Sequence, residues 1–186
     1  MKYRIITPVE KDIIKDLRAG DSVFLSGIIY TARDQAHKRI ADAINEGNEI
    51  PFELKDSAIY YSGPTPEHDD LIIGSCGPTT GSRMDKFSPL LMDHGNLIMI
   101  GKGQRNRAVK DAIIRNGAVY LGAAGGLGAM MAACVKKAEI IAYPDLGCEA
   151  VRKLVVEDMP LTVIIDSEGN DLYEIGPAEY LRSIEI

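Results

Sequence analysis

Apolar and polar positions alternate along the chain in two kinds of segment. Residues 22–30 and 58–62 are rich in β-branched and aromatic side chains and predict strands, whereas 31–47 has apolar positions at helical spacing and ends at a glycine. The same order is repeated downstream, with strands expected at 71–73, 97–100 and 118–121 and helices at 106–116 and 128–135. Strands that alternate with helices in this way predict a largely parallel sheet covered by helices.

The two ends of the chain depart from this alternation. Residues 7–10 (Thr-Pro-Val-Glu) match a capping box with proline in the first turn, so we expect an amphipathic helix from there to Gly20. Near the C-terminus, apolar segments 161–166 and 171–175 flank a short turn with glycine and asparagine, which is typical of a β-hairpin. The expected fold class is therefore α/β with a mixed, largely parallel central sheet, and residues 1–186 form one domain.

Composition limits the classes of protein that remain. The chain has 186 residues, of which 46% are hydrophobic, so it can bury one compact core. It has no run of about 18 apolar residues and no start resembling a signal peptide, so we expect a cytoplasmic protein that does not interact with a membrane. The formal net charge of −6 argues against nucleic acid as a partner. The three widely spaced cysteines lack a C-x-x-C pair, which indicates reduced thiols.

Two glycine-rich segments suggest a nucleotide site, but their spacing argues against it. A phosphate loop needs glycine and lysine followed by serine or threonine, and that combination occurs nowhere. In segment 122–128, the dinucleotide fingerprint would need glycine where Met131 stands. The histidines and cysteines show no metal-ligand spacing. We therefore expect neither a nucleotide site nor a metal site built by this chain alone.

Polar loops are expected after the carboxyl ends of several strands, where ligands bind in α/β sheets. The first contains Arg33, Asp34 and His37, and its alternative interpretation is a solvated helix start. The second, residues 63–68, is rich in proline and glycine and can be a purely structural turn.

Two further loops carry cations between glycines. Segment 74–86 has two threonines and Arg83, whose planar guanidinium suits a carboxylate. Lys102 stands between Gly101 and Gly103, where it is either a solvated charge or reaches inward. Cations and hydroxyls in a glycine-rich cleft of an acidic protein predict a receptor for a small dicarboxylate.

Taken in order, the loop motifs are similar to those of a known family. The motifs are Leu25-Ser26-Gly27, Thr31-Ala32-Arg33-Asp34, His37-Lys38-Arg39, Tyr60-Tyr61-Ser62-Gly63-Pro64-Thr65-Pro66, Gly77-Pro78-Thr79-Thr80, Arg83-Met84-Asp85, Ile100-Gly101-Lys102-Gly103, Gly125-Gly126, and Asp145-Leu146-Gly147 with Glu149-Ala150. This set resembles the β subunit, or the equivalent C-terminal domain, of iron–sulfur hydro-lyases of the class I fumarase and tartrate dehydratase family. The resemblance covers nearly the whole chain.

The resemblance implies a fold, a reaction and a partner. The fold would be a three-layer β/β/α swivelling domain. The reaction would be the reversible hydration of fumarate to (S)-malate, with L(+)-tartrate dehydratase, mesaconate hydratase and a non-catalytic dicarboxylate-binding module as alternatives. A [4Fe–4S] cluster would be bound by three cysteines of a partner α subunit, where one iron acts as a Lewis acid. Without that subunit the chain would be inactive, and the αβ pair would itself dimerise.

The resemblance also implies roles for individual residues. Arg33, Arg83 and Lys102 match the family's substrate-binding cations, which would stabilise charge that develops on a substrate carboxylate. Thr79 matches the residue proposed as the base at the substrate carbon. A threonine alkoxide is costly unless neighbouring charges tune it, so Thr80 remains an alternative. His37 is expected to contribute to substrate binding.

Overall fold

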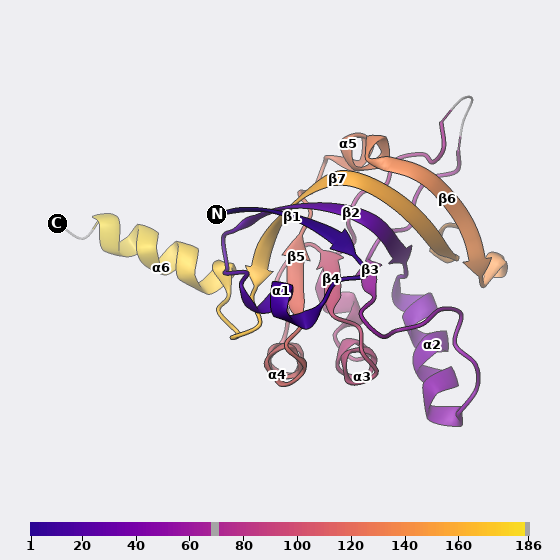
Figure 1. Ribbon diagram of the computed structural model, residues 1–186, viewed down its shortest axis with the longest axis horizontal. Helices are drawn as coiled ribbons and strands as arrows, with labels where there is room; N and C mark the ends of the chain where they lie inside the picture. Colours follow the sequence, from indigo (N-terminus) through magenta and orange to yellow (C-terminus); the bar gives the residue numbers. More distant parts are fainter. Residues whose placement is uncertain (68–70, 185–186) are drawn as a thin grey trace.

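The computed structural model describes residues 1–67 and 71–184 of the chain. A mixed seven-stranded sheet forms its centre, in the order β1-β2-β3-β4-β5-β7-β6 (Figure 1). The strands are β1 (Lys2–Thr7), β2 (Ser22–Thr31), β3 (Ala58–Tyr60), β4 (Ile98–Gly101), β5 (Val119–Gly122), β6 (Val135–Ala142) and β7 (Val151–Ile165). Because β2 also pairs with β7, five of the strands close into a ring. The expected α/β class is confirmed, while the three-layer swivelling arrangement stays a prediction.

Strand direction divides the sheet into two parts. Neighbours from β1 to β5 run parallel. Strand β7 runs antiparallel to β2, β5 and β6. The prediction of a parallel core joined to an antiparallel element is confirmed, and the predicted arm 161–166 falls in β7, although its partners are β2, β5 and β6.

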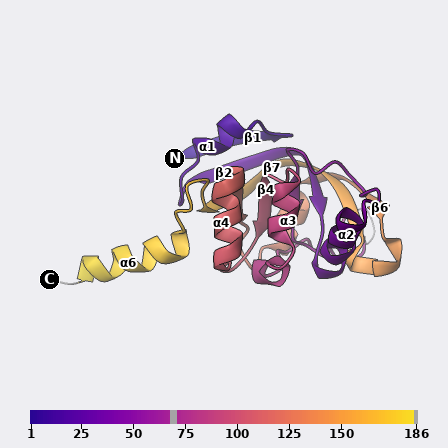
Figure 2. The same cartoon turned by 90° about the horizontal axis from the view of Figure 1, so that it is seen from below.

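Helices cover one face of the parallel strands. The helical segments are α1 (Lys11–Lys15), α2 (Asp34–Glu46), α3 (Ser88–Asp93), α4 (Arg107–Asn116), α5 (Gly128–Ala133) and α6 (Leu172–Ile184), with 3₁₀ segments η1 (Gly81–Met84) and η2 (Pro144–Glu149). Figure 2 shows α2, α3 and α4 on one side of the sheet and α1 on the other. Gly47 and Gly117 end α2 and α4 in the left-handed conformation, so both predicted helix ends are confirmed. Among the described helices, none is both long and apolar enough to cross a membrane.

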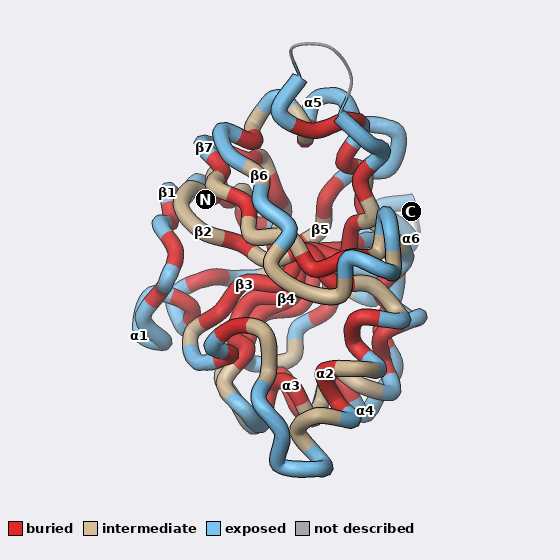
Figure 3. Tube along the Cα trace, turned by 90° about the vertical axis from the view of Figure 1, so that its right-hand side faces the viewer, coloured by how far each residue is buried: buried red, intermediate tan, exposed pale blue. Residues whose placement is uncertain are grey.

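The central strands are buried on both faces. In β4, Ile98 and Ile100 belong to one apolar cluster and Met99 to the other. In β5, Leu121 belongs to the first of these clusters and Tyr120 to the second. Figure 3 shows β3 and β4 as buried segments at the centre of the chain. Burial on two faces explains the continuous apolar runs from which these strands were predicted.

The N-terminal prediction is confirmed for a short helix but wrong for its cap and its extent. Thr7 does not cap a helix; it ends strand β1, and its hydroxyl donates a hydrogen bond to the carbonyl of Ile28 at 2.6 Å. Helix α1 is only five residues long and begins after Glu10. The side chain that matched a capping box is therefore used across the first two strands of the sheet.

Two predicted strands are also absent from the described residues. Segment 71–73 forms no strand, and its side chains Leu71 and Ile72 are exposed. The second arm of the predicted hairpin is instead the start of helix α6, which extends away from the sheet (Figure 1). The side chain of Asp171 accepts a hydrogen bond from the backbone N–H of Tyr173 at 2.9 Å, which is a helix cap. Asp171 and Glu174 have capping-box spacing, a signal present in the sequence that the hairpin interpretation missed.

Candidate functional site

Loops that follow the parallel strands gather at one edge of the sheet, as predicted. The segment before η1 lies between the ends of β3 and β4. The backbone N–H of Thr79 donates to the Tyr61 carbonyl at 2.6 Å, and that of Lys102 donates to the Thr79 carbonyl at 3.3 Å. Gly81 donates to the Lys102 carbonyl at 2.7 Å. These bonds place the predicted base and the predicted lysine side by side, with Thr79 half-buried and Thr80 exposed.

Arg33 is the residue that precedes the first turn of α2. It is mostly buried and forms an ion pair with Glu149, with Nη2 and Oε1 3.2 Å apart. Its guanidinium lies against Gly63, where an added Cβ would come within 2.9 Å of Nη1. The glycine of the second loop therefore leaves room for the arginine of the first. His68, from the same predicted loop, lies outside the described residues.

Arg83 and Asp34 form a second ion pair at the same edge. The Arg83 side chain is half exposed, whereas Asp34 is mostly buried at the start of α2. One carboxylate oxygen of Asp34, Oδ1, is buried without a hydrogen-bond partner among the described residues. The pair therefore joins a half-exposed cation to a carboxylate that could accept a further hydrogen bond.

Lys102 is exposed at the end of β4, beside the glycine-rich loop after β5. A Cβ added at Gly125 would lie 3.7 Å from the Lys102 ammonium nitrogen. The small residues of this loop, which carry no nucleotide-binding spacing, thus leave the lysine accessible.

His37 is located differently from the cations. It is buried under the first turn of α2, packs edge-on against Tyr61 with ring centroids 5.2 Å apart, and donates from Nδ1 to the carbonyl of Arg33 at 3.0 Å. Burial, helped by the nearby charge of Arg105, lowers the pKa of His37 to about 4, although the hydrogen bond to the Arg33 carbonyl acts in the opposite direction. Direct contact of His37 with a substrate stays a prediction, and its observed contact is with the backbone of Arg33.

Protonation of this histidine should destabilise the fold in mild acid. The unfolded chain binds the proton with a pKa of 6.5 and the folded chain with a pKa of about 4, so stability falls as pH decreases through this window. Between about pH 7.5 and about pH 5 the His37 contribution should reach about 2 kcal/mol of unfolding free energy. Urea unfolding of the wild type and of His37→Gln at the two pH values measures the difference. His94→Gln, at an exposed histidine, is the control. An equal pH dependence in all three proteins would contradict the assignment.

An anchor below the site was missed by the sequence analysis. The Arg105 side chain is fully buried, and its Nε donates to Asp85 Oδ1 at 2.6 Å while Nη2 donates to Ser88 Oγ at 2.7 Å. Asp85 follows the loop of Arg83, and Arg105 follows the loop of Lys102. The pair therefore ties the two cation-bearing loops together. Nothing in the sequence distinguishes Arg105 from a solvated arginine, because its partner is 20 residues away.

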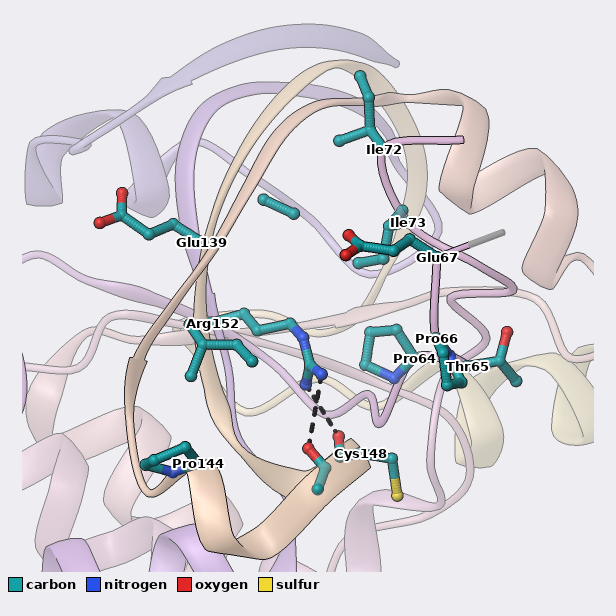
Figure 4. A pocket seen from close by; sticks show the side chains of 13 residues that line it. Pro64, Thr65, Pro66, Glu67, Ile72, Ile73, Glu139, Pro144, Cys148 and Arg152 are labelled. Atoms are coloured by element: carbon teal, nitrogen blue, oxygen red, sulfur yellow. Dashed lines mark hydrogen bonds between the residues drawn. The ribbon is translucent and has the colours of Figure 1, made fainter. Parts of the chain in front are cut away.

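One hollow of the described structure is not lined by the predicted cations. It has a volume of about 510 Å³ and lies between residues 64–67 and 72–73, strand β6 and η2 (Figure 4). Its walls are mainly proline and isoleucine, and the guanidinium of Arg152 on its border bonds to the Cys148 carbonyl at 3.2 Å. The cation-bearing edge has the free donors that an anion requires, so we place the candidate site there.

The cysteines do not fit an iron–sulfur cluster. Cys76 is buried after β3, Cys134 follows α5, and Cys148 is exposed in η2. Burial raises the pKa of the Cys76 thiol, which disfavours the thiolate that a cluster needs. Within residues 1–67 and 71–184, no group of three or more His, Cys, Asp or Glu residues is arranged to hold a metal ion.

A mixed α/β domain that gathers three cations and two hydroxyls beside glycine-rich loops is suited to binding a small anion. The sequence matches the family described as Fumarase C-terminus over residues 3–176. The chain therefore belongs to the fumarase C-terminus family.

Curated relatives include long and short proteins. The anaerobic class I fumarate hydratase of Escherichia coli is 43% identical over 152 residues, which cover 81% of this chain and 28% of that protein. Fumarate hydratase 2 of Leishmania major is 38% identical over 93% of this chain and 31% of its own length. A Methanocaldococcus jannaschii protein, provisionally named L(+)-tartrate dehydratase subunit beta, is 38% identical over 94% of this chain and 92% of its own. The chain thus spans about a third or less of the fumarate hydratases and nearly all of the subunit-sized relative.

Proposed function

We propose that this chain is the β subunit of an iron–sulfur hydro-lyase that hydrates fumarate reversibly to (S)-malate. The observation that carries the proposal is the position of Arg33, Arg83 and Lys102 on loops at one edge of the parallel strands. Membership of the fumarase C-terminus family supports the same reaction class.

In the proposed mechanism the cations hold the two substrate carboxylates. Malate dehydration removes a proton from the carbon beside one carboxylate and hydroxide from the neighbouring carbon, so that a double bond and one water form. As the proton leaves, negative charge spreads onto the carboxylate beside it. Preorganised arginine and lysine donors stabilise this charge more than they stabilise the ground state. Thr79, half-buried next to Lys102, is the proposed proton acceptor, and Thr80 is the alternative. In this proposal the ammonium of Lys102 turns toward the Thr79 hydroxyl, where its charge would lower the cost of an alkoxide.

The proposed cofactor, a [4Fe–4S] cluster, belongs in this scheme to a partner α subunit. The separate positions of the cysteines support this division, because the described part of the chain offers no ligand set. Two long relatives, both named fumarate hydratases, contain more than twice as much further sequence as the part that matches this chain. In the proposed assembly that missing part is the α subunit, and αβ pairs associate further in the cytoplasm.

One observation favours a second candidate, the β subunit of an L(+)-tartrate dehydratase. The subunit-sized relative from M. jannaschii matches this chain over 92% of its own length. Tartrate and mesaconate, like fumarate, carry two carboxylates. The same cations would therefore serve fumarate hydration, tartrate dehydration and mesaconate hydration. A non-catalytic dicarboxylate-binding module remains the alternative from another class.

The test is anaerobic co-expression of the chain with a candidate α subunit, followed by assays with fumarate, L(+)-tartrate and mesaconate. We expect turnover by the complex, and neither turnover nor stoichiometric iron in the isolated chain. Dominant turnover of one substrate would decide among the three reactions. Hydration by the isolated iron-free chain at a rate of order 10 per second would refute the two-subunit mechanism. A complex that binds these dicarboxylates without converting any of them would support the binding module.

A further inference from the structure

Helix α2 begins without a cap from its own N-cap residue. Arg33 occupies that position in an extended conformation, and its side chain carries donors only, so it cannot accept from the free N–H groups of the first turn. A capping oxygen must therefore come from elsewhere. Oε2 of Glu149 accepts the backbone N–H of Gln35 at 3.1 Å, from a position 114 residues further along the chain.

The same carboxylate holds the Arg33 side chain. Oε1 of Glu149 lies 3.2 Å from Nη2 of Arg33, and the two side chains are 16% and 19% exposed. A mostly buried pair of this kind is screened less by solvent than a surface pair. Gly63 closes the other side of the guanidinium, since a Cβ there would lie 3.0 Å from Cδ of Arg33. The arginine is thus confined between a carboxylate and a backbone wall.

The segment that carries Glu149 is itself anchored at both ends. Arg39 on α2 forms an ion pair with Asp145 and lies over the ring of Tyr143, with 5.1 Å from its guanidinium carbon to the ring centroid. At the other end, Arg152 donates to the carbonyls of Cys148 and Ala150 at 3.2 and 3.3 Å, and Figure 4 shows the first of these bonds. Segment 143–152 is therefore held at both ends and places Glu149 at the start of α2.

One donor of Arg33 remains unused in this arrangement. Its Nε is buried and has no hydrogen-bond partner among the described residues. A buried donor without an acceptor is costly, so the contacts of Arg33 with Glu149 and Gly63 must hold the side chain in place against that cost. Without the carboxylate, the long side chain would regain rotamers that point away from the site.

We propose that Glu149 is a positioning residue that fixes the guanidinium of Arg33 for a substrate carboxylate. The inference rests on the proposed function, in which Arg33 binds a substrate carboxylate. Glu149 does not touch substrate or the reacting atoms; it acts through Arg33. Its loss should impair binding of the dicarboxylate more than turnover, because a misplaced donor weakens the ground state and the transition state together.

The kinetic test uses Glu149→Gln in the αβ complex. We expect kcat/KM to fall roughly 10- to 100-fold, mainly through a higher KM, because displacement of a binding group by about 1 Å can cost about a hundredfold. Glu149→Asp, which keeps the charge, should recover part of the loss. Glu157→Gln, at an exposed glutamate of β7, is the matched control and should leave KM unchanged. In an Arg33→Ala background, Glu149→Gln should have no further effect on kcat/KM.

A purely structural cap gives a different result. It would lower the melting temperature of Glu149→Gln while leaving KM unchanged in the folded enzyme, and that outcome would overturn the proposal. A second measurement does not need activity: NMR of the arginine Nε–H groups in the isolated chain, with the Arg33 signal assigned by its absence in Arg33→Lys. We expect a slowly exchanging Arg33 signal in the wild type that is lost in Glu149→Gln. If the wild-type complex converts no dicarboxylate, the proposed function fails, and the NMR comparison still decides the role of Glu149.

Discussion

Replacing Arg105 with methionine should lower the unfolding free energy of the chain by about 3–5 kcal/mol, the range for breaking a buried ion pair from one side. The Asp85 carboxylate would keep its bond from the backbone N–H of Asn106, 2.8 Å long, but would lose the charged donor at 2.6 Å. Arg105 also lies over two aromatic rings, 4.8 Å from the centroid of Tyr120 and 5.3 Å from that of Tyr61. Methionine would fill part of the space without neutralising Asp85.

Urea unfolding followed by circular dichroism measures this loss. In the double variant Arg105→Met, Asp85→Leu no buried charge is left unpaired, so it should recover much of the stability. Arg107→Met, at an arginine of α4 that is 83% exposed, is the matched control. A loss below about 1 kcal/mol for Arg105→Met, the range of exposed pairs, would mean that the buried pair does not hold the two loops.

The parts of the fold that were predictable are those with local signals. Helices α2 and α4 have apolar spacing and glycine ends, and both were confirmed within a few residues. Strand β1 has no such signal, because only Ile5 and Thr7 along it are buried and its stability comes from pairing with β2. Most of β7 was missed for a related reason. Asp158 has a φ of 47° and Pro160 follows it, so the sequence resembles a turn although the strand continues.

The residues of the candidate site also fall into those with a local sequence signal and those without one. Arg33, Thr79, Arg83 and Lys102 stand in motifs at strand ends, and their gathering follows from parallel strands. Glu149 and Arg105 make contacts with residues far away in the chain, and only the folded structure shows them. The proposed ligand-binding residues are therefore easier to predict here than the residues that position them, because the latter are defined by tertiary contacts.

Exchange of Arg83 for lysine should reduce kcat/KM of the proposed αβ complex roughly 30- to 900-fold. This corresponds to a loss of about 2–4 kcal/mol of transition-state stabilisation. Arg83 is half exposed, and its guanidinium pairs with Oδ2 of Asp34. The other carboxylate oxygen of Asp34, Oδ1, has no hydrogen-bond partner among the described residues. A guanidinium can bond Asp34 with one edge and a substrate carboxylate with another, because its donors form a planar fork. An ammonium has no second planar edge, so lysine must divide its single charge between Asp34 and the substrate.

The loss should therefore appear in both KM and kcat, while the stability of the chain changes little because the Arg83 side chain is half exposed. Arg107→Lys makes the same chemical change at an exposed arginine that pairs with Asp111 within α4, and should leave both constants unchanged. Steady-state kinetics with fumarate under anaerobic conditions, together with urea unfolding of each variant, separates the two effects. Wild-type kcat/KM in Arg83→Lys would assign the Arg83–Asp34 pair to the surface and leave substrate binding to Arg33 and Lys102.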